Sequence, residues 1–194
     1  MAVQGELRIL SLDIVGLPEG WPPTSGITDA AGVFLGYLAL DLIIGNTDRH
    51  HENWGILVGN GPKDAWLAPS FDHAASLGQI LRDEERQRRL STRDTRQDVQ
   101  AWARRARSAL YAGPEDDRPL STADAFTSGC KRRRVEANVW ADRADAIAQG
   151  TVDALVSTIP ATRMSDVAKR FAVALILANL RNLREAGVRG GDLA

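Results

Sequence analysis

Residues 46–53 read NTDRHHEN, and residues 69–73 read PSFDH. These two short polar stretches decide the interpretation of the chain. They carry an aspartate at position 48, an asparagine at position 53 and a second aspartate at position 72. Carboxylate and amide oxygens are the ligands that hard cations such as Mg²⁺ prefer in proteins. What lies around the two stretches tells us whether their side chains meet.

Regular elements are predicted on both sides of the first stretch. Residues 29–44 are apolar at helical spacing and nearly all round, which predicts a well-buried helix with Thr28 as its N-cap. Residues 54–58 and 65–68 are short apolar runs joined by a glycine-rich turn, which is the pattern of a β-hairpin. A hairpin returns the chain towards its start, so we expect the second polar stretch to lie beside the first.

Phosphoryl transfer to a hydroxyl requires side chains of these types. One carboxylate must accept the hydroxyl proton, and oxygen ligands must hold the Mg²⁺ that neutralises charge on the phosphates. Protein kinases place a catalytic aspartate, an asparagine five residues later, a strand pair and then a metal-binding aspartate in this order. The spacing predicts Asp48 as the base, Asn53 as a metal ligand and Asp72 as the main metal ligand. The alternative is that Asp48 and Asn53 only cap the loop after a helix.

The same residues resemble a known family. The runs GNTDRHHENWGILV and WLAPSFDHAASLG are similar to the HipA-like serine/threonine kinases, which are bacterial relatives of the phosphatidylinositol 3- and 4-kinases. That family has a segment N-x-D-x-H-x-x-N, then a hairpin, then P-x-[YF]-D. The matching residues here are Asn46, Asp48, His50, Asn53, Pro69, Phe71 and Asp72.

The resemblance implies a fold. It is mainly α, a protein-kinase-like C-lobe with a small catalytic β-hairpin, forming a single unit over residues 1–194. An irregular lead-in (1–27) would precede the catalytic core (28–80) and a helical part (81–194). Within the lead-in, residues 7–12 could form a short strand. In the helical part we expect two helices over 82–107, a short one capped by Ser121, others over 135–149 and 152–157, and a last one capped by Ser165 and closed by Gly187.

The resemblance also implies a site and its cofactors. Asp48 would be the catalytic base, and Asn53 and Asp72 would hold Mg²⁺ and through it ATP. His50 would lie in the catalytic loop and brace it by hydrogen bonds. The activity implied is ATP- and Mg²⁺-dependent phosphorylation of a serine or threonine hydroxyl of a protein.

The chain departs from a complete kinase before Asp48. A kinase N-lobe carries a phosphate-covering loop and a strand lysine, whereas the only lysines here are Lys63, Lys131 and Lys169. We therefore expect a C-lobe without its N-lobe, so the enzyme assignment stays open. A separate polypeptide could supply the N-lobe, as in divided operons of related toxin–antitoxin systems. Alternatively, the chain could be truncated, could bind a nucleotide or peptide weakly without turnover, or could be a decayed remnant.

Other functions are compatible with the same residues. A catalytically inactive pseudokinase or binding module could use the same cleft, and the missing lysine favours it unless an N-lobe is found. A lipid kinase is a more distant alternative, since the sequence has no membrane-seeking helix and no large basic surface. A partner that bears the N-lobe, or self-association, is expected because an isolated C-lobe exposes its apolar cleft face.

Composition limits location and partners. Of 194 residues, 44% are hydrophobic and 25% charged, and the net charge is −1. Such a balance is typical of a globular protein and gives no overall attraction to nucleic acid or membranes. A single cysteine fits a reducing cytoplasm, and no apolar run approaches the roughly 20 residues of a membrane span. We expect a cytoplasmic protein that contacts nucleic acid only indirectly, if at all.

Three further features have an ordinary and a functional interpretation. The basic run 131–134 is usually a solvated helix start, but it could instead hold a substrate phosphate or nucleic acid. Trp54 and Trp66 most simply pack on each other or on the core, and stacking on adenine is the alternative. Cys130 also has two interpretations. The basic run beside it could lower the pKa of its thiol, but a nucleophilic cysteine would also need a positioned base.

Overall fold

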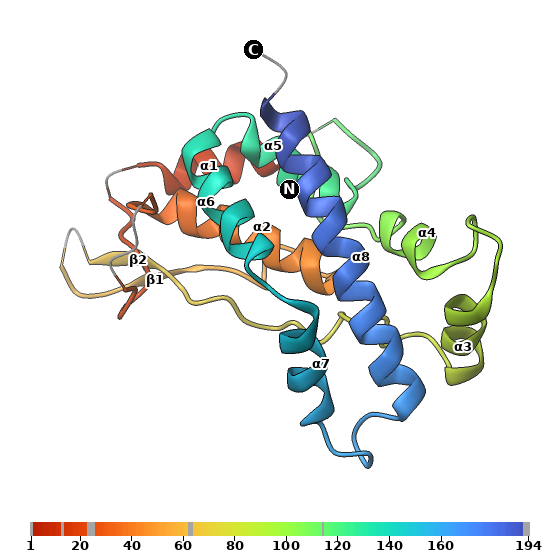
Figure 1. Cartoon of the computed structure of the whole chain (residues 1–194). Helices are drawn as coiled ribbons and strands as arrows, with labels where there is room; N and C mark the ends of the chain where they lie inside the picture. The colour runs from red at the N-terminus through yellow and green to blue at the C-terminus, as the bar shows by residue number, and fades with distance from the viewer. Residues whose placement is uncertain (1, 13, 23–25, 62–63, 114, 192–194) are drawn as a thin grey trace.

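The computed structural model describes residues 2–12, 14–22, 26–61, 64–113 and 115–191, with the backbone only at residues 4 and 187–191 (Figure 1). The fold is mostly helical, with one two-stranded antiparallel sheet in the described residues. The elements are α1 (Val3–Leu10), α2 (Ala30–Ile44), β1 (Ile56–Val58), β2 (Ala65–Leu67), α3 (Asp83–Ser91), α4 (Val99–Arg104), α5 (Thr122–Cys130), α6 (Arg134–Asp145), α7 (Gln149–Ser157) and α8 (Asp166–Gly191).

Helix α2 lies at the centre of the fold. It contacts α1, α5, α6 and α8, which explains why its sequence is apolar nearly all round. Its N-cap is Asp29, whose side chain accepts a hydrogen bond from the Gly32 amide at 2.8 Å, so the predicted cap at Thr28 is one residue early. Its predicted end is confirmed, because Gly45 adopts the left-handed conformation with a φ of 64°. The polar stretch 46–53 therefore starts directly at the buried end of α2.

The predicted hairpin is present but shorter than expected. Strands β1 and β2 pair antiparallel, with Leu57 opposite Trp66. Trp54 lies before β1 and packs on Phe34 of α2, with ring centres 5.0 Å apart. The tryptophan therefore packs on the core, and it does not pair with Trp66 across the strands.

The predicted irregular lead-in is wrong over residues 3–10, which form α1 and contain most of the expected strand at 7–12. Val3, Leu7 and Leu10 recur at helical spacing and are each no more than 2% exposed. That apolar stripe packs on α2 and α5, so the helix is stabilised by burial of one face. Residues 1, 13 and 23–25 of the lead-in lie outside the described residues.

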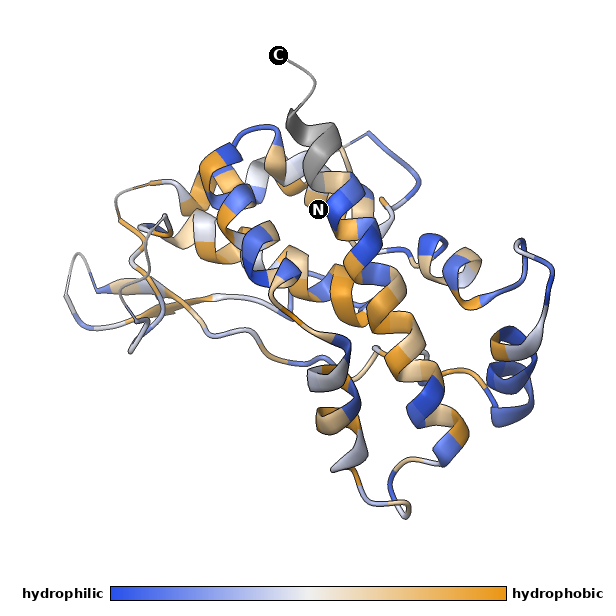
Figure 2. Cartoon of the chain, viewed as in Figure 1, coloured by the Kyte–Doolittle hydropathy of each residue, from blue (hydrophilic) through white to orange (hydrophobic). Residues whose placement is uncertain are grey.

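The helical part follows the predicted order. Helices α3 and α4 occupy the charged segment, and Ser121 caps α5 by accepting a hydrogen bond from the Asp124 amide at 3.0 Å. Ser165 caps α8 through the Ala168 amide, but α8 runs past Gly187 to Gly191. Figure 2 shows the apolar middle of α8, which packs on the core, and the polar surface of α3. Within the described ranges, no helix combines the length and apolarity that crossing a membrane requires.

Close packing between α2 and α6 gives a first test. A Cβ atom built on Gly36 would lie 2.3 Å from the Trp140 ring, closer than any real contact. We predict that Gly36→Ala lowers the free energy of unfolding by about 1–3 kcal/mol, the usual effect of overpacking. Urea denaturation followed by circular dichroism measures the change.

The matched control is Gly150→Ala in α7, where nothing lies within 4 Å of the added Cβ. It should leave stability unchanged or raise it by up to about 1 kcal/mol, because alanine favours helix. Equal destabilisation by both substitutions would contradict the packing of Trp140 on α2.

Candidate active site

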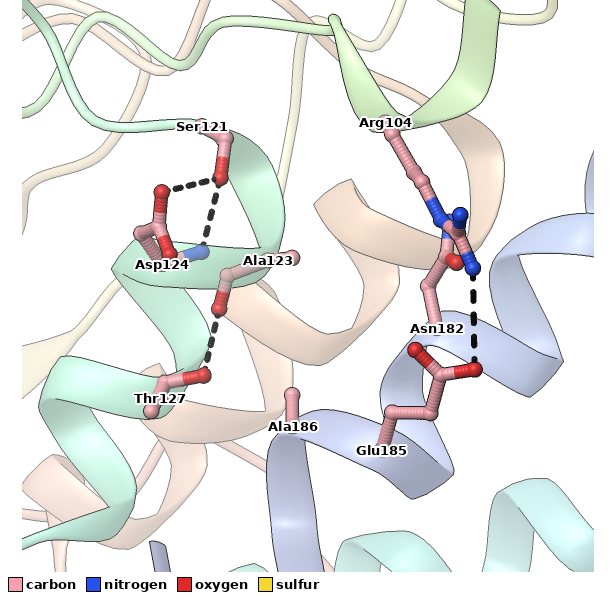
Figure 3. Close-up of a pocket in the computed structure, with 8 residues that line it drawn as sticks. All are labelled: Arg104, Ser121, Ala123, Asp124, Thr127, Asn182, Glu185 and Ala186. Carbon is pink, nitrogen blue, oxygen red and sulfur yellow. Dashed lines mark hydrogen bonds and ion pairs between the residues drawn. The ribbon is translucent and has the colours of Figure 1, made fainter. Parts of the chain in front are cut away.

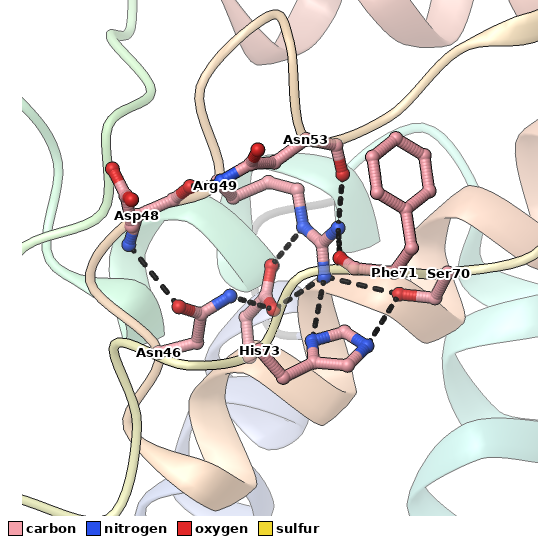
Figure 4. Close-up of polar contacts among 8 residues, drawn as sticks. Asn46, Asp48, Arg49, Asn53, Ser70, Phe71 and His73 are labelled. Atoms are coloured by element: carbon pink, nitrogen blue, oxygen red, sulfur yellow. Dashed lines mark hydrogen bonds and ion pairs between the residues drawn. The ribbon is translucent and has the colours of Figure 1, made fainter. Parts of the chain in front are cut away.

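A buried ion pair lies at the base of the polar stretch 46–53 (Figure 4). Arg49 is 0% exposed, and Asp41, the only charged residue of α2, is 3% exposed. The Arg49 Nε and Nη2 atoms each donate to one carboxylate oxygen of Asp41 at 2.8 Å. This bidentate geometry fixes the guanidinium plane relative to α2.

The rest of the Arg49 guanidinium bridges both polar stretches. Its Nη1 donates to the backbone carbonyl of Asn53 at 2.5 Å and to that of Phe71 at 3.3 Å. Its Nη2 also contacts the Ser70 hydroxyl at 3.0 Å and His73 Nδ1 at 3.3 Å. One side chain thus binds the backbone at the end of the first stretch and the residue before Asp72.

His73 lies between Arg49 and Ser70. Its Nδ1 is 3.3 Å from the Arg49 Nη2, a contact in which only the arginine can donate because arginine has no acceptor atom. Its Nε2 is 3.1 Å from the Ser70 Oγ. Ser70 and His73 therefore contact each other and the buried guanidinium.

Two asparagines fix the backbone around Asp48. Asn46 is fully buried, donates to Asp41 at 2.8 Å and accepts from the Asp48 amide at 3.2 Å. Asn53 donates through Nδ2 to the Asp48 carbonyl at 2.7 Å. Because that bond uses the amide nitrogen, the Asn53 Oδ1 is left as the acceptor atom of the side chain.

The Asp48 carboxylate is half-exposed, with His50 beside it. The Asp48 side chain is 51% exposed, and its Oδ1 lies 3.6 Å from His50 Nε2. His50 Nδ1 accepts from the Glu52 amide at 3.2 Å, so a neutral ring carries its proton on Nε2, facing Asp48. The structure thus brings His50 and Asn53 into contact with Asp48 or its backbone.

Asp72 lies on the second stretch in an unusual conformation. Its φ is 51°, in the left-handed region that residues other than glycine adopt at a cost of order 1 kcal/mol. Its exposed side chain forms no hydrogen bond or ion pair with the described residues. The structure therefore gives it no direct contact with Asp48, His50 or Asn53.

Backbone bonds hold the two stretches beside each other after Asp72. The Thr47 amide donates to the Ala75 carbonyl at 3.2 Å, and the Leu77 amide donates to the Ile44 carbonyl at 2.8 Å. Leu77 also has a positive φ of 54°. The chain that follows Asp72 thus runs alongside the chain that leads to Asp48.

Tyr37 of α2 also contacts this cluster. Its hydroxyl donates to the Ala68 carbonyl at 2.8 Å, and its ring lies 5.9 Å from the Arg49 guanidinium carbon. Burial raises the pKa of Tyr37 to about 12, against the opposing effects of Arg49 and a backbone hydrogen bond at Ser70. The phenol is therefore neutral at physiological pH and remains a hydrogen-bond donor.

Sequence analysis did not single out Asp41, Arg49, Ser70 or His73. A signal for the first was available: a lone acid in an otherwise apolar, buried helix requires a partner. Its partner could not be read from spacing, because arginine is abundant in this chain and the pairing is tertiary.

Two features with open interpretations have structural roles. Arg133 of the basic run pairs with Asp29 at the start of α2 and with Glu136, so it joins α6 to α2. Cys130 is 1% exposed, and burial raises the pKa of its thiol to about 12. The interpretation that the basic run lowers the thiol pKa is therefore wrong, because a buried thiol is harder to ionise.

A polar cavity of about 350 Å³ lies between α4, α5 and α8, away from the polar stretches (Figure 3). Its polar side chains are partnered: Arg104 lies 3.7 Å from Glu185, and Gln100 donates to Asn182 at 2.6 Å. Asn182 donates to Asn179, which reaches the Ile43 carbonyl near the end of α2. We infer that these bonds brace the helix end that precedes Asp48.

Comparison with solved structures identifies the class of fold. The chain is similar to a crystal structure of a Helicobacter pylori proinflammatory kinase, CtkA, with a TM-score of 0.62 and 22% sequence identity. The match covers 84% of this chain and 56% of that one, so this chain spans little more than half of its structural neighbour. No protein-family model and no curated protein matches. The fold is kinase-like, and its helical body with a small sheet is consistent with a kinase C-lobe.

Substitution of Arg49 tests whether the candidate site depends on the buried ion pair. Arg49→Met leaves the Asp41 carboxylate buried without its partner, so we predict a loss of about 3–5 kcal/mol in the free energy of unfolding. Arg104→Met is the control, because this arginine is 59% exposed beside Glu185 and should change stability by less than about 0.5 kcal/mol. Urea denaturation compares them, and equal effects would contradict a central role for Arg49.

Proposed function

We propose that this chain is the catalytic C-lobe of an ATP- and Mg²⁺-dependent kinase that phosphorylates a serine or threonine hydroxyl of a protein. The observation that carries the proposal is the half-exposed Asp48 carboxylate, held by a backbone that Asn46 and Asn53 fix from both sides. The kinase-like fold supports it independently of the residue pattern.

Asp48 is suited to act as the base. Its carboxylate reaches solvent, and its backbone is fixed at the amide and at the carbonyl. In the transfer, the bond between the terminal phosphorus and its bridging oxygen breaks, a bond to the acceptor oxygen forms, and Asp48 takes the hydroxyl proton. His50 Nε2 lies 3.6 Å from the Asp48 Oδ1, just beyond hydrogen-bond distance, so the ring flanks the carboxylate without binding it directly.

Asn53 and Asp72 are suited to hold Mg²⁺. The Asn53 Oδ1 is the acceptor left over from the bond to Asp48, and the Asp72 carboxylate has no partner among the described residues. Both supply oxygen, which Mg²⁺ prefers. A bound Mg²⁺ would neutralise the charge that develops on the phosphates during transfer.

The proposal includes a partner. No lysine precedes Asp48 in this sequence, and kinases use a strand lysine to contact the nucleotide phosphates. We therefore propose that this lysine and the phosphate-covering loop come from another polypeptide or another part of a longer protein. We expect such a lobe to cover apolar surface, and Val58 is one apolar side chain that is 76% exposed on the hairpin.

An inactive pseudokinase is the second candidate, and the same lysine observation favours it. Such a protein would bind Mg²⁺ and nucleotide through Asn53 and Asp72 but would transfer no phosphate with any added N-lobe. The two candidates therefore differ in transfer and agree in binding.

Two substitutions test the proposed roles. Transfer of radiolabelled phosphate and Mg²⁺-dependent ATP binding are measured for the chain alone and with the products of neighbouring genes. We expect Asp48→Asn to lower transfer by roughly 10²–10⁴-fold, the usual contribution of a positioned base, while ATP binding persists. Asp72→Asn should lose the Mg²⁺-dependent part of ATP binding.

The control is Asp142→Asn, which removes an exposed carboxylate of α6 and should change neither quantity. Circular dichroism checks that each variant is folded. If the substitutions at 48 and 72 behave as wild type in an active preparation, the assignment of both residues is wrong.

A further inference from the structure

A second, chemically different cavity lies between α2 and α6. It has a volume of about 320 Å³ and is lined mainly by apolar side chains of α2 and α6, together with Trp21 and Ser70. Leu40 and Ile43 contribute from α2, and Ile147 lies beyond the end of α6. Ligand sites are concave, mostly apolar and equipped with a few polar groups, and this volume is at their lower end.

Two of the residues that line this cavity carry hydrogen-bond donors without an acceptor. The Trp21 Nε1 is buried and has no hydrogen-bond partner. Arg143 lies with its guanidinium carbon 4.7 Å from the centre of the Trp140 ring, and in the described part of the chain it forms no ion pair or hydrogen bond. Other arginines near buried helix ends, such as Arg133, are paired with acids.

Among the described residues that line the cavity none is acidic, and Arg143 is the only charged one. Two acids lie near Arg143 on the same helix. Asp145 is already paired with Arg184, and Asp142 does not line the cavity. An apolar space with one uncompensated cation and one unpaired indole N–H is complementary to an anion that has an apolar body.

The walls of the cavity are fixed by other contacts. Trp140 donates through Nε1 to the Gly32 carbonyl at 2.8 Å and lies against Gly36. Trp21 packs edge-on against Trp140, with ring centres 6.3 Å apart. A ligand would therefore meet a preformed Trp140 wall, which lowers the ordering cost of binding, whereas the buried Trp21 Nε1 becomes reachable only when its ring shifts.

We propose that this cavity binds a small amphipathic carboxylate, with the carboxylate at Arg143 and Trp21 Nε1 and the apolar body between α2 and α6. Since a water molecule occupies about 30 Å³ in the liquid, the cavity holds roughly ten non-hydrogen atoms, the size of octanoate. The proposal does not rest on kinase activity.

The site is adjacent to the Arg49 cluster through two shared residues. Tyr37 and Ser70 line the cavity, and both also contact the Arg49 guanidinium. An occupant would therefore lie one side chain away from the cation that binds both polar stretches.

Calorimetric titration at neutral pH tests the proposal with octanoate and with uncharged 1-octanol as probes. We expect one octanoate per chain, bound at least about tenfold more tightly than 1-octanol, because a charged hydrogen bond contributes at least that factor. Arg143→Met should remove the preference for octanoate while keeping the apolar contacts. Trp21→Phe, which keeps the packing and removes the donor, should weaken octanoate more than 1-octanol, whose neutral hydroxyl oxygen is the weaker acceptor.

Arg88→Met is the matched control, because Arg88 is 64% exposed on α3, far in sequence from every lining residue, and should leave both probes unchanged. Absence of octanoate binding would overturn the proposal. So would equal binding of octanoate to wild type and Arg143→Met, or equal affinity for the two probes, since each outcome removes the role of the cation.

Discussion

The buried ion pair between Asp41 and Arg49 is the interaction on which the candidate site depends. Removing two charges from water costs several kcal/mol for each ion, so such a pair persists only where good geometry and further hydrogen bonds satisfy both groups. Here Arg49 uses all three guanidinium nitrogens, and Asp41 accepts from Asn46 as well. The pair contributes little net stability compared with an apolar core, and its role is to define one arrangement of the chain.

That arrangement joins elements distant in the sequence. Asp41 belongs to the rigid, buried helix α2, and Arg49 transfers the position of that helix to the carbonyls of Asn53 and Phe71. The hairpin between these carbonyls is short and packs through Trp54 on α2, so both of its ends return to the same guanidinium. Asp48 and Asp72 are exposed at the edges of this cluster.

Local patterns predicted much of this from the sequence, and long-range pairing explains the rest. The apolar run of α2, its end at Gly45 and the two apolar runs of the hairpin are local signals, and both elements are present, although the hairpin strands are shorter than predicted. Helix α1 was missed because its apolar residues, Val3, Leu7 and Leu10, are few, and only packing against α2 and α5 makes them a helical face. Arg49 was missed because nothing local distinguishes it from the other arginines.

The central proposal is that one buried arginine holds two chain segments in such a way that Asn53 and Asp72 bind a single divalent cation. Titration with paramagnetic Mn²⁺ in place of Mg²⁺, followed by nuclear magnetic resonance, tests it most directly, because Mn²⁺ broadens signals from nearby nuclei. The account predicts that the Asn53 side-chain amide and the Asp72 signals broaden together, at the same Mn²⁺ concentration and before other exposed acids. Broadening of only one of them, or of the two at clearly different concentrations, would contradict it.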